Sequence, residues 1–212
     1  MHLDFSLRFD FFGCGESSPH FLADLTVNGM LQDAKAALCY LEQTITAQNI
    51  SIGLCGFSLG AAITGLLMQD KCFPSVVGLS PVINLMNDLA YQHQNLIDDM
   101  LNKPLNDNEP IEYDLGWRKI PIRPEFIRQF AHFDPLIAAN WQKYAGACLV
   151  IGGELDFSGE NVKRFNQTAP NVRILRQEFL RQTDHVFNIF TGSDNHAPWV
   201  IETVTNWFIK TL

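Results

Sequence analysis

Apolar residues recur along this chain in two patterns, one typical of helices and one typical of buried strands. Between Asn28 and Gln48 they fall at alternating steps of three and four residues, which predicts an amphipathic helix of about five turns. Short continuous apolar runs at Ile50–Cys55, Ser75–Ser80 and Ala147–Ile151 instead predict buried strands. Helical and strand segments therefore alternate along the chain.

The same alternation continues toward the C-terminus and gives a consistent topology. Helices are predicted over Leu59–Gln69, Glu160–Thr168 and Pro198–Leu212, and a further strand is predicted over Val172–Glu178. Strands joined through helices need right-handed crossovers, and they form a parallel sheet that helices cover on both faces. The pattern predicts the α/β class, with a mostly parallel, doubly wound sheet in a single domain over residues 1–212.

Residues 82–145 interrupt this alternation. A helical stretch over Asn84–Leu101 leads into a polar loop, after which Pro121, Pro124 and Pro135 are predicted to separate short helices rich in aromatic residues. An insertion of this length is compatible with a helical lid over a site, and equally with a layer that packs its aromatic side chains inward. The sequence leaves both interpretations open.

Composition excludes several classes of function. The chain of 212 residues carries 15 Lys and Arg against 23 Asp and Glu, a net charge of −8 with no basic stripe, which argues against nucleic acid binding. No apolar run is long enough to span a membrane, and the N-terminus lacks the core of a signal peptide. The five cysteines are widely spaced, as expected for free thiols in a cytoplasmic protein rather than for a disulfide or zinc set. We expect no metal and no cofactor.

A serine lies between the predicted strand that ends at Cys55 and the helix that begins at Leu59, with no loop between them. Gly56 and Gly60 flank Ser58 at a spacing of two residues, the G-x-S-x-G pattern of a sharp strand-to-helix turn. Such a turn presents the serine hydroxyl at the carboxyl end of the sheet. It also points the Leu59 N–H, at the helix N-terminus, toward an anion that forms beside the serine. We expect a branched side chain at either glycine to collide with this turn.

A serine nucleophile needs a base within hydrogen-bond reach, and the base needs a carboxylate that orients it. In this architecture the acid and then the histidine follow the serine along the chain, in loops at the carboxyl ends of later strands. Asp156 and His185 occupy such positions. Glu154 is the alternative acid, two residues nearer the strand, and His196 is the alternative base, at the start of the last predicted helix.

Four segments in this order resemble those of the α/β-hydrolase fold superfamily, in the branch of serine aminopeptidases and cinnamoyl or feruloyl esterases. Residues 8–17 resemble its D-x-R-G-x-G-x-S segment, with Phe12 where an arginine is usual. Residues 56–60 resemble the nucleophile turn, residues 153–156 the acid turn, and residues 184–187 the histidine loop. The resemblance implies the fold of that superfamily with residues 82–145 as a helical lid insertion, and it implies Leu59 as one oxyanion donor.

The resemblance also implies that a chain beginning at Met1 is shortened at its N-terminus. Leu3–Phe9 alternates weakly and predicts a strand. In the superfamily another strand separates this one from the strand before the serine, and a second oxyanion donor follows that separating strand, near a His-Gly pair. We therefore expect Leu3–Phe9 to pair directly with Ile50–Cys55 in a sheet of about five strands, or to leave unpaired edges that favour a homodimer. Turnover by such a chain is expected to be weak.

The leading hypothesis is a serine hydrolase that cleaves a small-molecule carboxylic ester through Ser58, His185 and Asp156 and an acyl-enzyme. An aminopeptidase or amidase of the same fold is the alternative, in which Glu109, Glu112 and Asp114 would bind a free amine. A catalytically weak, truncated relic is the hypothesis from a different class. The sequence names no substrate-binding residues.

Overall fold

A computed structural model of the protein describes residues 5–17, 24–45, 50–104, 106–114, 119–191 and 194–212. The chain divides into two compact units. The sheet unit comprises residues 1–6, 47–84 and 136–212, and the second unit comprises residues 7–46 and 85–135. The single domain predicted over residues 1–212 stays a prediction.

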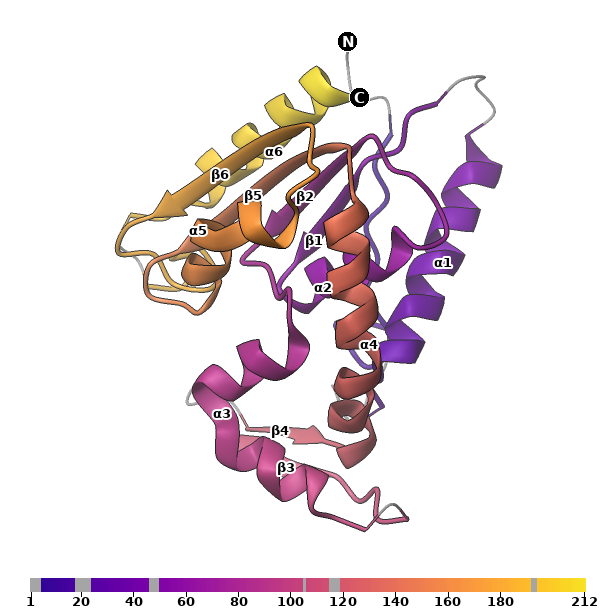
Figure 1. The fold of residues 1–212 in the computed structure, drawn as a ribbon, viewed down its shortest axis with the longest axis vertical. Helices are drawn as coiled ribbons and strands as arrows, with labels where there is room; N and C mark the ends of the chain where they lie inside the picture. The colour runs from indigo at the N-terminus through magenta and orange to yellow at the C-terminus, as the bar shows by residue number, and fades with distance from the viewer. Residues whose placement is uncertain (1–4, 18–23, 46–49, 105, 115–118, 192–193) are drawn as a thin grey trace. The chain divides into compact units, whose positions relative to one another are not determined.

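The sheet unit contains four strands that pair in parallel in the order β1-β2-β5-β6 (Figure 1). Their bounds are Leu54–Phe57 for β1, Ser75–Leu79 for β2, Ala147–Gly153 for β5 and Ile174–Leu180 for β6. All seven residues of β5 are buried, as its continuous apolar run predicts for a central strand. The mostly parallel sheet predicted from the alternation of helices and strands is confirmed.

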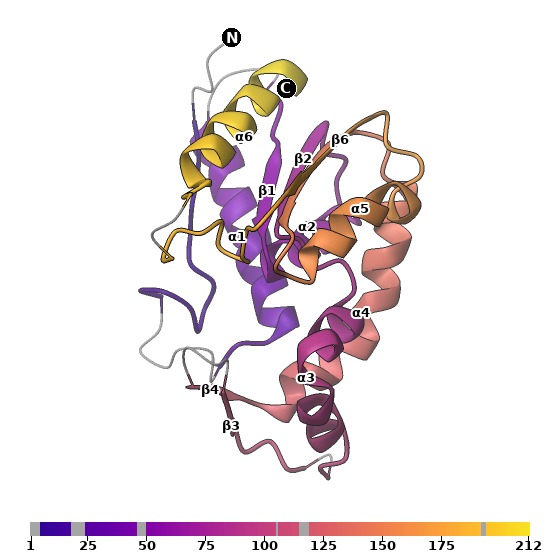
Figure 2. The same ribbon diagram turned by 90° about the vertical axis from the view of Figure 1, so that its left-hand side faces the viewer.

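Helices cover both faces of this sheet. Helix α5 (Ser158–Thr168) and helix α6 (Ala197–Thr211) lie on opposite faces (Figure 2). Helix α2 (Leu59–Leu67) packs on β1 and β2. Trp141 joins α2 to α5, because a side chain at Gly65 would meet the Trp141 indole nitrogen and the Trp141 ring lies 5.0 Å from that of Phe165. The doubly wound arrangement therefore agrees with the prediction.

The core of the sheet unit forms between α6 and the central strands. Val200, Trp207 and Phe208 repeat at helical spacing and pack with the buried residues of β2 and β5, which include Val77 and Leu149. Burial of this apolar face stabilises the unit by roughly 1.5–3 kcal/mol for each large side chain.

The second unit contains α1 (Val27–Thr44), α3 (Leu85–Leu101) and an antiparallel hairpin of β3 (Ile111–Asp114) with β4 (Lys119–Ile122). Helix α4 (Pro124–Lys143) begins in this unit and ends in the sheet unit.

Side-chain oxygens satisfy the first N–H groups of two of these helices. The Thr26 hydroxyl accepts from Gly29 N–H at the start of α1. The buried Asp134 carboxylate accepts from Leu85 N–H at 2.6 Å and from Met86 N–H at 2.9 Å, at the start of α3. Burial raises the pKa of the Asp134 carboxyl more than these two hydrogen bonds lower it.

The strand predicted over Leu3–Phe9 is wrong in its described part, residues 5–9, which form no strand and are exposed. Leu3 lies outside the described residues. A weak alternation of apolar residues forms a strand only where the backbone N–H and C=O groups find partners. The expected pairing of this segment with the strand before the serine is absent from the described residues, whose parallel sheet has four strands and not five.

The strand predicted over Ile50–Cys55 lies further along the chain, at Leu54–Phe57, and it is only partly buried. Within the described sheet β1 pairs with β2 alone, and Cys55 and Phe57 on this strand are exposed. The apolar run indicated a strand but could not show how many neighbours that strand has.

Three prolines were predicted to separate short helices, and this prediction is also wrong. Pro121 lies within β4, Pro124 is the first residue of α4, and Pro135 lies inside that helix, which continues to Lys143. Proline is well tolerated at the first helical position because no intrahelical bond is lost there. Inside α4, Pro135 removes one hydrogen bond, and the burial of Ile127, Phe130, Ile137 and Trp141 along the helix offsets that loss.

The two glycines that flank Ser58 differ in the space around them. A Cβ at Gly56 would lie 2.5 Å from the Gly60 carbonyl oxygen and 2.6 Å from the Ala61 nitrogen. A Cβ at Gly60 would meet no described atom within 4 Å, so the collision expected at Gly60 is wrong. The close approach of β1 and α2 constrains Gly56 alone.

Substitution Gly56→Val should therefore lower the free energy of unfolding by about 1–3 kcal/mol, because the branched side chain must displace backbone atoms. The melting temperature measures this effect. Gly60→Ala is the matched control and should leave the melting temperature unchanged or slightly raised, since alanine favours the helix. Equal losses in both variants would contradict the constraint at Gly56.

Candidate active site

Ser58 occupies a strained turn between β1 and α2. Its φ of 53° and ψ of −121° fall outside the regions that non-glycine residues normally adopt. The Ser58 N–H donates to the Leu79 carbonyl at 2.8 Å, and the Ser58 carbonyl accepts from Ala61 N–H at 3.0 Å and from Val82 N–H at 3.2 Å. The end of β2 thus holds the sharp turn that the glycine spacing predicts.

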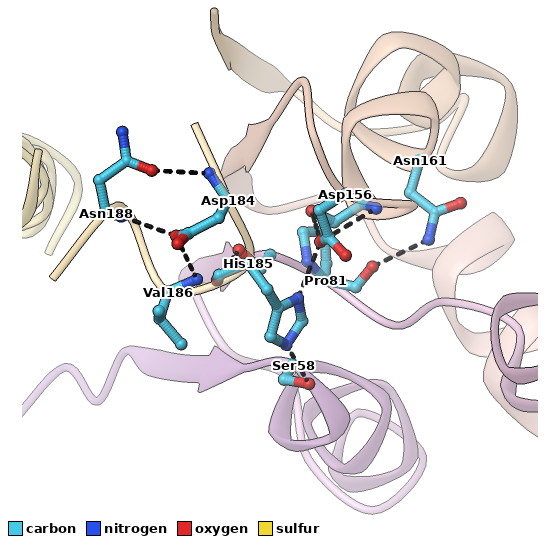
Figure 3. Close-up of polar contacts among 10 residues, drawn as sticks. Ser58, Pro81, Asp156, Asn161, Asp184, His185, Val186 and Asn188 are labelled. Atoms are coloured by element: carbon cyan, nitrogen blue, oxygen red, sulfur yellow. Dashed lines mark hydrogen bonds and ion pairs between the residues drawn. The ribbon is translucent and has the colours of Figure 1, made fainter. Parts of the chain in front are cut away.

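His185 lies between Ser58 and Asp156 (Figure 3). Its Nε2 is 2.9 Å from the Ser58 hydroxyl oxygen, and its Nδ1 is 2.8 Å from Asp156 Oδ2. The three residues follow the carboxyl ends of β1, β5 and β6, which parallel strands place at one edge of the sheet. The structure brings together the three residues that the sequence analysis selected.

The Asp156 carboxylate is almost fully buried, with 4 % of its side chain exposed. Its Oδ2 also lies 2.5 Å from the Ser158 hydroxyl and 3.3 Å from the Ser158 N–H. Burial raises the pKa of the Asp156 carboxyl, but the hydrogen bond and charge of His185 and the two hydrogen bonds from Ser158 together hold that pKa below its ordinary value. Asp156 is therefore ionised at neutral pH.

A reciprocal pair of side chains braces the loop that carries His185 (Figure 3). The Asp184 carboxylate accepts from Val186 N–H at 3.1 Å and from Asn188 N–H at 2.7 Å. The Asn188 side-chain oxygen accepts from Asp184 N–H at 2.9 Å, and its NH₂ donates to the Gln182 carbonyl at 3.0 Å. Asn188 itself has a φ of 60°. These bonds hold the turn in a conformation that an isolated peptide would rarely adopt.

The alternative acid and base form other hydrogen bonds. Glu154 accepts from Gln182 N–H at 2.9 Å, and its own N–H donates to the Leu180 carbonyl. His196 is the N-cap residue of α6, and its N–H donates to the Phe187 carbonyl at 3.0 Å. Both line an open polar cavity of about 450 Å³, and the other residues that line it are Arg181, Gln182, Asn188 and Asp194.

Leu59 is the first residue of α2, directly after Ser58. The first N–H groups of a helix have no partner within it and carry the positive end of its dipole. The Ser58 side chain does not cap this helix. The role of the Leu59 N–H as an oxyanion donor stays a prediction, and the start of α2 directly after Ser58 is compatible with it.

Four residues that contact His185 or Asp156 were missed by the sequence analysis, as was Asn188 in the histidine loop. The Ser80 hydroxyl donates to the His185 carbonyl at 2.8 Å, and Ser158 bonds Asp156. The rings of Phe57 and Phe157 lie 5.3 and 5.5 Å from the His185 ring. Phe57 directly precedes Ser58 and Phe157 directly follows Asp156, so adjacency in sequence could have indicated both. Ser80 follows a different strand, and no sequence signal connected it to His185.

Two further classes of feature were sought within the described ranges. No group of three or more His, Cys, Asp or Glu side chains there is arranged to hold a metal ion. No helix among these residues combines the length and the apolar character that crossing a lipid bilayer requires.

Comparison with known proteins relates this chain to others through structure rather than sequence. No family model matches the sequence, and no curated protein matches it. A monoglyceride lipase from Saccharomyces cerevisiae superposes with a TM-score of 0.74 at 15% identity, covering 95% of this chain and 76% of the lipase. Est1E from Butyrivibrio proteoclasticus, solved with ferulic acid bound, gives a TM-score of 0.64 at 18% identity and covers 95% and 75%.

The esterase domain of a Rhodothermus marinus protein is similar as well, with a TM-score of 0.60 at 19% identity over 90% of this chain and 71% of that domain. These structures are esterases and lipases with an α/β-hydrolase fold. This chain has the α/β-hydrolase fold. At such low identities the likeness concerns the arrangement of helices and strands, and the fold agrees with the one that the four sequence segments implied.

Asn188 offers a test of how the α/β-hydrolase fold supports its histidine loop. Asn188→Ala removes two side-chain hydrogen bonds. It also leaves an alanine at positive φ, a conformation that asparagine tolerates better. We expect the two effects together to lower the free energy of unfolding by about 1–2 kcal/mol. Asn188→Gly relieves the backbone strain at positive φ, but it does not restore the two side-chain hydrogen bonds. Chemical denaturation of both variants measures the two contributions. Wild-type stability in Asn188→Ala would contradict the bracing role.

Proposed function

We propose that this protein is a serine hydrolase that cleaves small carboxylic esters, with Ser58 as nucleophile, His185 as general base and Asp156 as the orienting acid. The observation that carries the proposal is the continuous hydrogen-bonded series from Asp156 through His185 to Ser58, whose serine sits on a strained turn. A serine of this kind is activated by removal of its proton, and both ring nitrogens of His185 have partners suited to that task.

With the proton of neutral His185 on Nδ1, directed at Asp156, the lone pair of Nε2 faces the Ser58 hydroxyl. Nε2 takes the hydroxyl proton as Ser58 Oγ attacks the ester carbonyl carbon. The carbonyl oxygen becomes an oxyanion, which the Leu59 N–H stabilises. Collapse of this intermediate breaks the bond to the alcohol, which leaves with the proton from Nε2. Water then attacks the acyl-enzyme in the same manner and releases the acid and the free serine.

Two observations favour esters that carry an apolar or aromatic group. Phe57, 44 % exposed, and Leu155, 67 % exposed, directly precede Ser58 and Asp156 in the chain. Est1E, which has the same fold, was solved with ferulic acid, an aromatic carboxylic acid. An apolar substrate group gains free energy when it covers such exposed side chains.

The amidase alternative receives less support. Of the three acidic residues suggested to bind a free amine, Glu112 forms an ion pair with Lys119 at 2.9 Å. The side chain of Asp114 lies outside the described residues. A panel of p-nitrophenyl and aryl esters against aminoacyl anilides separates the two activities. Faster turnover of the anilides would overturn the assignment to esters. The cytoplasmic location and the homodimer remain predictions.

Ser58→Ala and His185→Ala should each lower kcat/KM for an activated ester by roughly 10⁴-fold or more. The nucleophile and the base act as a unit, so the loss of either one removes the activity of both. The double variant should lose little beyond either single variant. Labelling by a fluorophosphonate probe provides a second measurement and should disappear in Ser58→Ala. Absence of labelling in the wild-type protein would instead support the relic hypothesis.

The pH dependence of kcat/KM should show one rising limb between pH 5 and pH 8, because a histidine base must be neutral to accept the serine proton. Because the pKa of Asp156 is held below its ordinary value, the stability contributed by its charge is complete above about pH 4 and is lost only at lower pH. The activity lost at pH 5 should therefore return fully when the sample is brought back to pH 8. A flat profile between pH 5 and pH 8 would contradict a histidine base.

A further inference from the structure

Ser158 is the first residue of α5, and its side chain is completely buried, with 0 % of the residue exposed. The backbone of β5 packs directly against it. A Cβ at Gly152 would lie 2.9 Å from the Ser158 carbonyl oxygen and 3.0 Å from its hydroxyl oxygen. Only a glycine at 152 leaves room for Ser158 in this position, and the close packing restricts where its hydroxyl can lie.

Both the hydroxyl and the N–H of Ser158 approach one oxygen of Asp156. The hydroxyl is 2.5 Å and the N–H 3.3 Å from Asp156 Oδ2. The same oxygen accepts the Nδ1–H of His185 at 2.8 Å. Oδ2 therefore receives three donors, two of them from a residue that follows Asp156 by two positions in the chain. A hydrogen bond to an ionised carboxylate is stronger than one between two neutral groups, and it restricts the rotation of the carboxylate.

We propose that Ser158 is a positioning residue of the active site, which orients the Asp156 carboxylate and shares its Oδ2 with His185. The proposal rests on the proposed function, because it assigns Ser158 a role in the same hydrolysis. Ser158 does not contact the reacting atoms. It acts through Asp156, whose orientation sets the direction of the imidazole that faces Ser58.

This role predicts a defined change in the pH profile. Without the Ser158 hydroxyl, the negative charge on Oδ2 is shared with one fewer donor and binds the protonated imidazole more strongly. The rising limb of kcat/KM should then move to higher pH. The nearby titratable groups do not replace the hydroxyl. Asp184 accepts from Val186 and Asn188, Glu154 accepts from Gln182, and Glu160 on α5 pairs with Lys163 and Arg164.

The experiment compares Ser158→Ala with Ser75→Ala, a matched control. Ser75 is equally buried at 0 % exposure, and its hydroxyl accepts from that of Thr211 at 2.7 Å, on strand β2 rather than at the site. With p-nitrophenyl acetate, Ser158→Ala should lower kcat/KM about 10-fold and move the rising limb up by about 0.5 pH unit. Ser75→Ala should leave the limb in place. A rising limb at the same pH in both variants would overturn the proposal.

A double-mutant cycle with Asp156→Asn tests whether Ser158 acts through the carboxylate. Ser158→Ala should cost no more than about 2-fold in the Asp156→Asn background, because the charge it orients is gone. A full 10-fold loss in that background would show that Ser158 acts by another route. If Ser158→Ala does not fold, Ser158→Cys retains the size and a weak donor, and it should give a smaller shift of the limb in the same direction. A Cys variant with the wild-type limb would overturn the proposal.

One readout does not depend on turnover. The low-field proton resonance of the hydrogen-bonded His185 Nδ1–H, assigned by its loss in His185→Ala, should move in Ser158→Ala and stay in place in Ser75→Ala. If the wild-type protein shows neither probe labelling nor ester turnover, the proposed function fails, and this resonance still tests the position of Ser158. If the wild type is active and the resonance does not move, the positioning role alone fails.

Discussion

Ser58 is held at a positive φ by hydrogen bonds that join its own backbone to the ends of β2 and α2. A non-glycine residue in this conformation costs about 1–3 kcal/mol, so the turn persists only because the parallel pairing of β1 with β2 supplies the Leu79 carbonyl. The same requirement explains Gly56, whose missing side chain lets the helix start directly against the strand. The position of the half-buried hydroxyl beside His185 and the start of α2 directly after the serine are consequences of this one constraint.

Burial of the Asp156 carboxylate imposes a second constraint on the same end of the sheet. An ionised carboxylate that is withdrawn from water is costly unless donors surround it. Ser158 and His185 provide those donors, and they fix the carboxylate as they do so. The histidine is fixed in turn by the loop around Asp184 and Asn188 and by the Ser80 hydroxyl. These polar groups therefore have partners that also orient them. The proposed chemistry requires the groups to be oriented before the substrate reacts.

The sheet that carries these loops is asymmetric. β5 is buried throughout, whereas β1, which presents the serine, has exposed residues on either side of Gly56. Phe57 is one of them, and its ring lies both beside His185 and 6.3 Å from that of Phe187. An aromatic residue at this position can shield the imidazole on one side and remain available to an apolar ligand on the other.

Elements with local signals could be predicted from the amino-acid sequence. The glycine spacing around Ser58, the apolar run of β5 and the helical period of α6 each depend on contacts between neighbouring residues or on one buried face, and all three appear where they were expected. Asp156 and His185 could be selected because chain order and strand ends limit the candidates. The sharpness of the turn and the α/β class followed from the same short-range rules.

Features that depend on partners distant in sequence arise only in the folded chain. Phe5–Phe9 forms no strand because a strand needs a neighbour that no local pattern specifies, and α4 continues through Pro135 because its burial offsets one lost hydrogen bond. Gly60 carries the same motif signal as Gly56 and yet faces open space among the described residues. Ser80 reaches His185 across 105 positions of the chain, which only the folded sheet brings together. Local interactions thus determine the helices, the strands and the candidate site residues. Long-range packing and hydrogen bonding determine which of these come into contact.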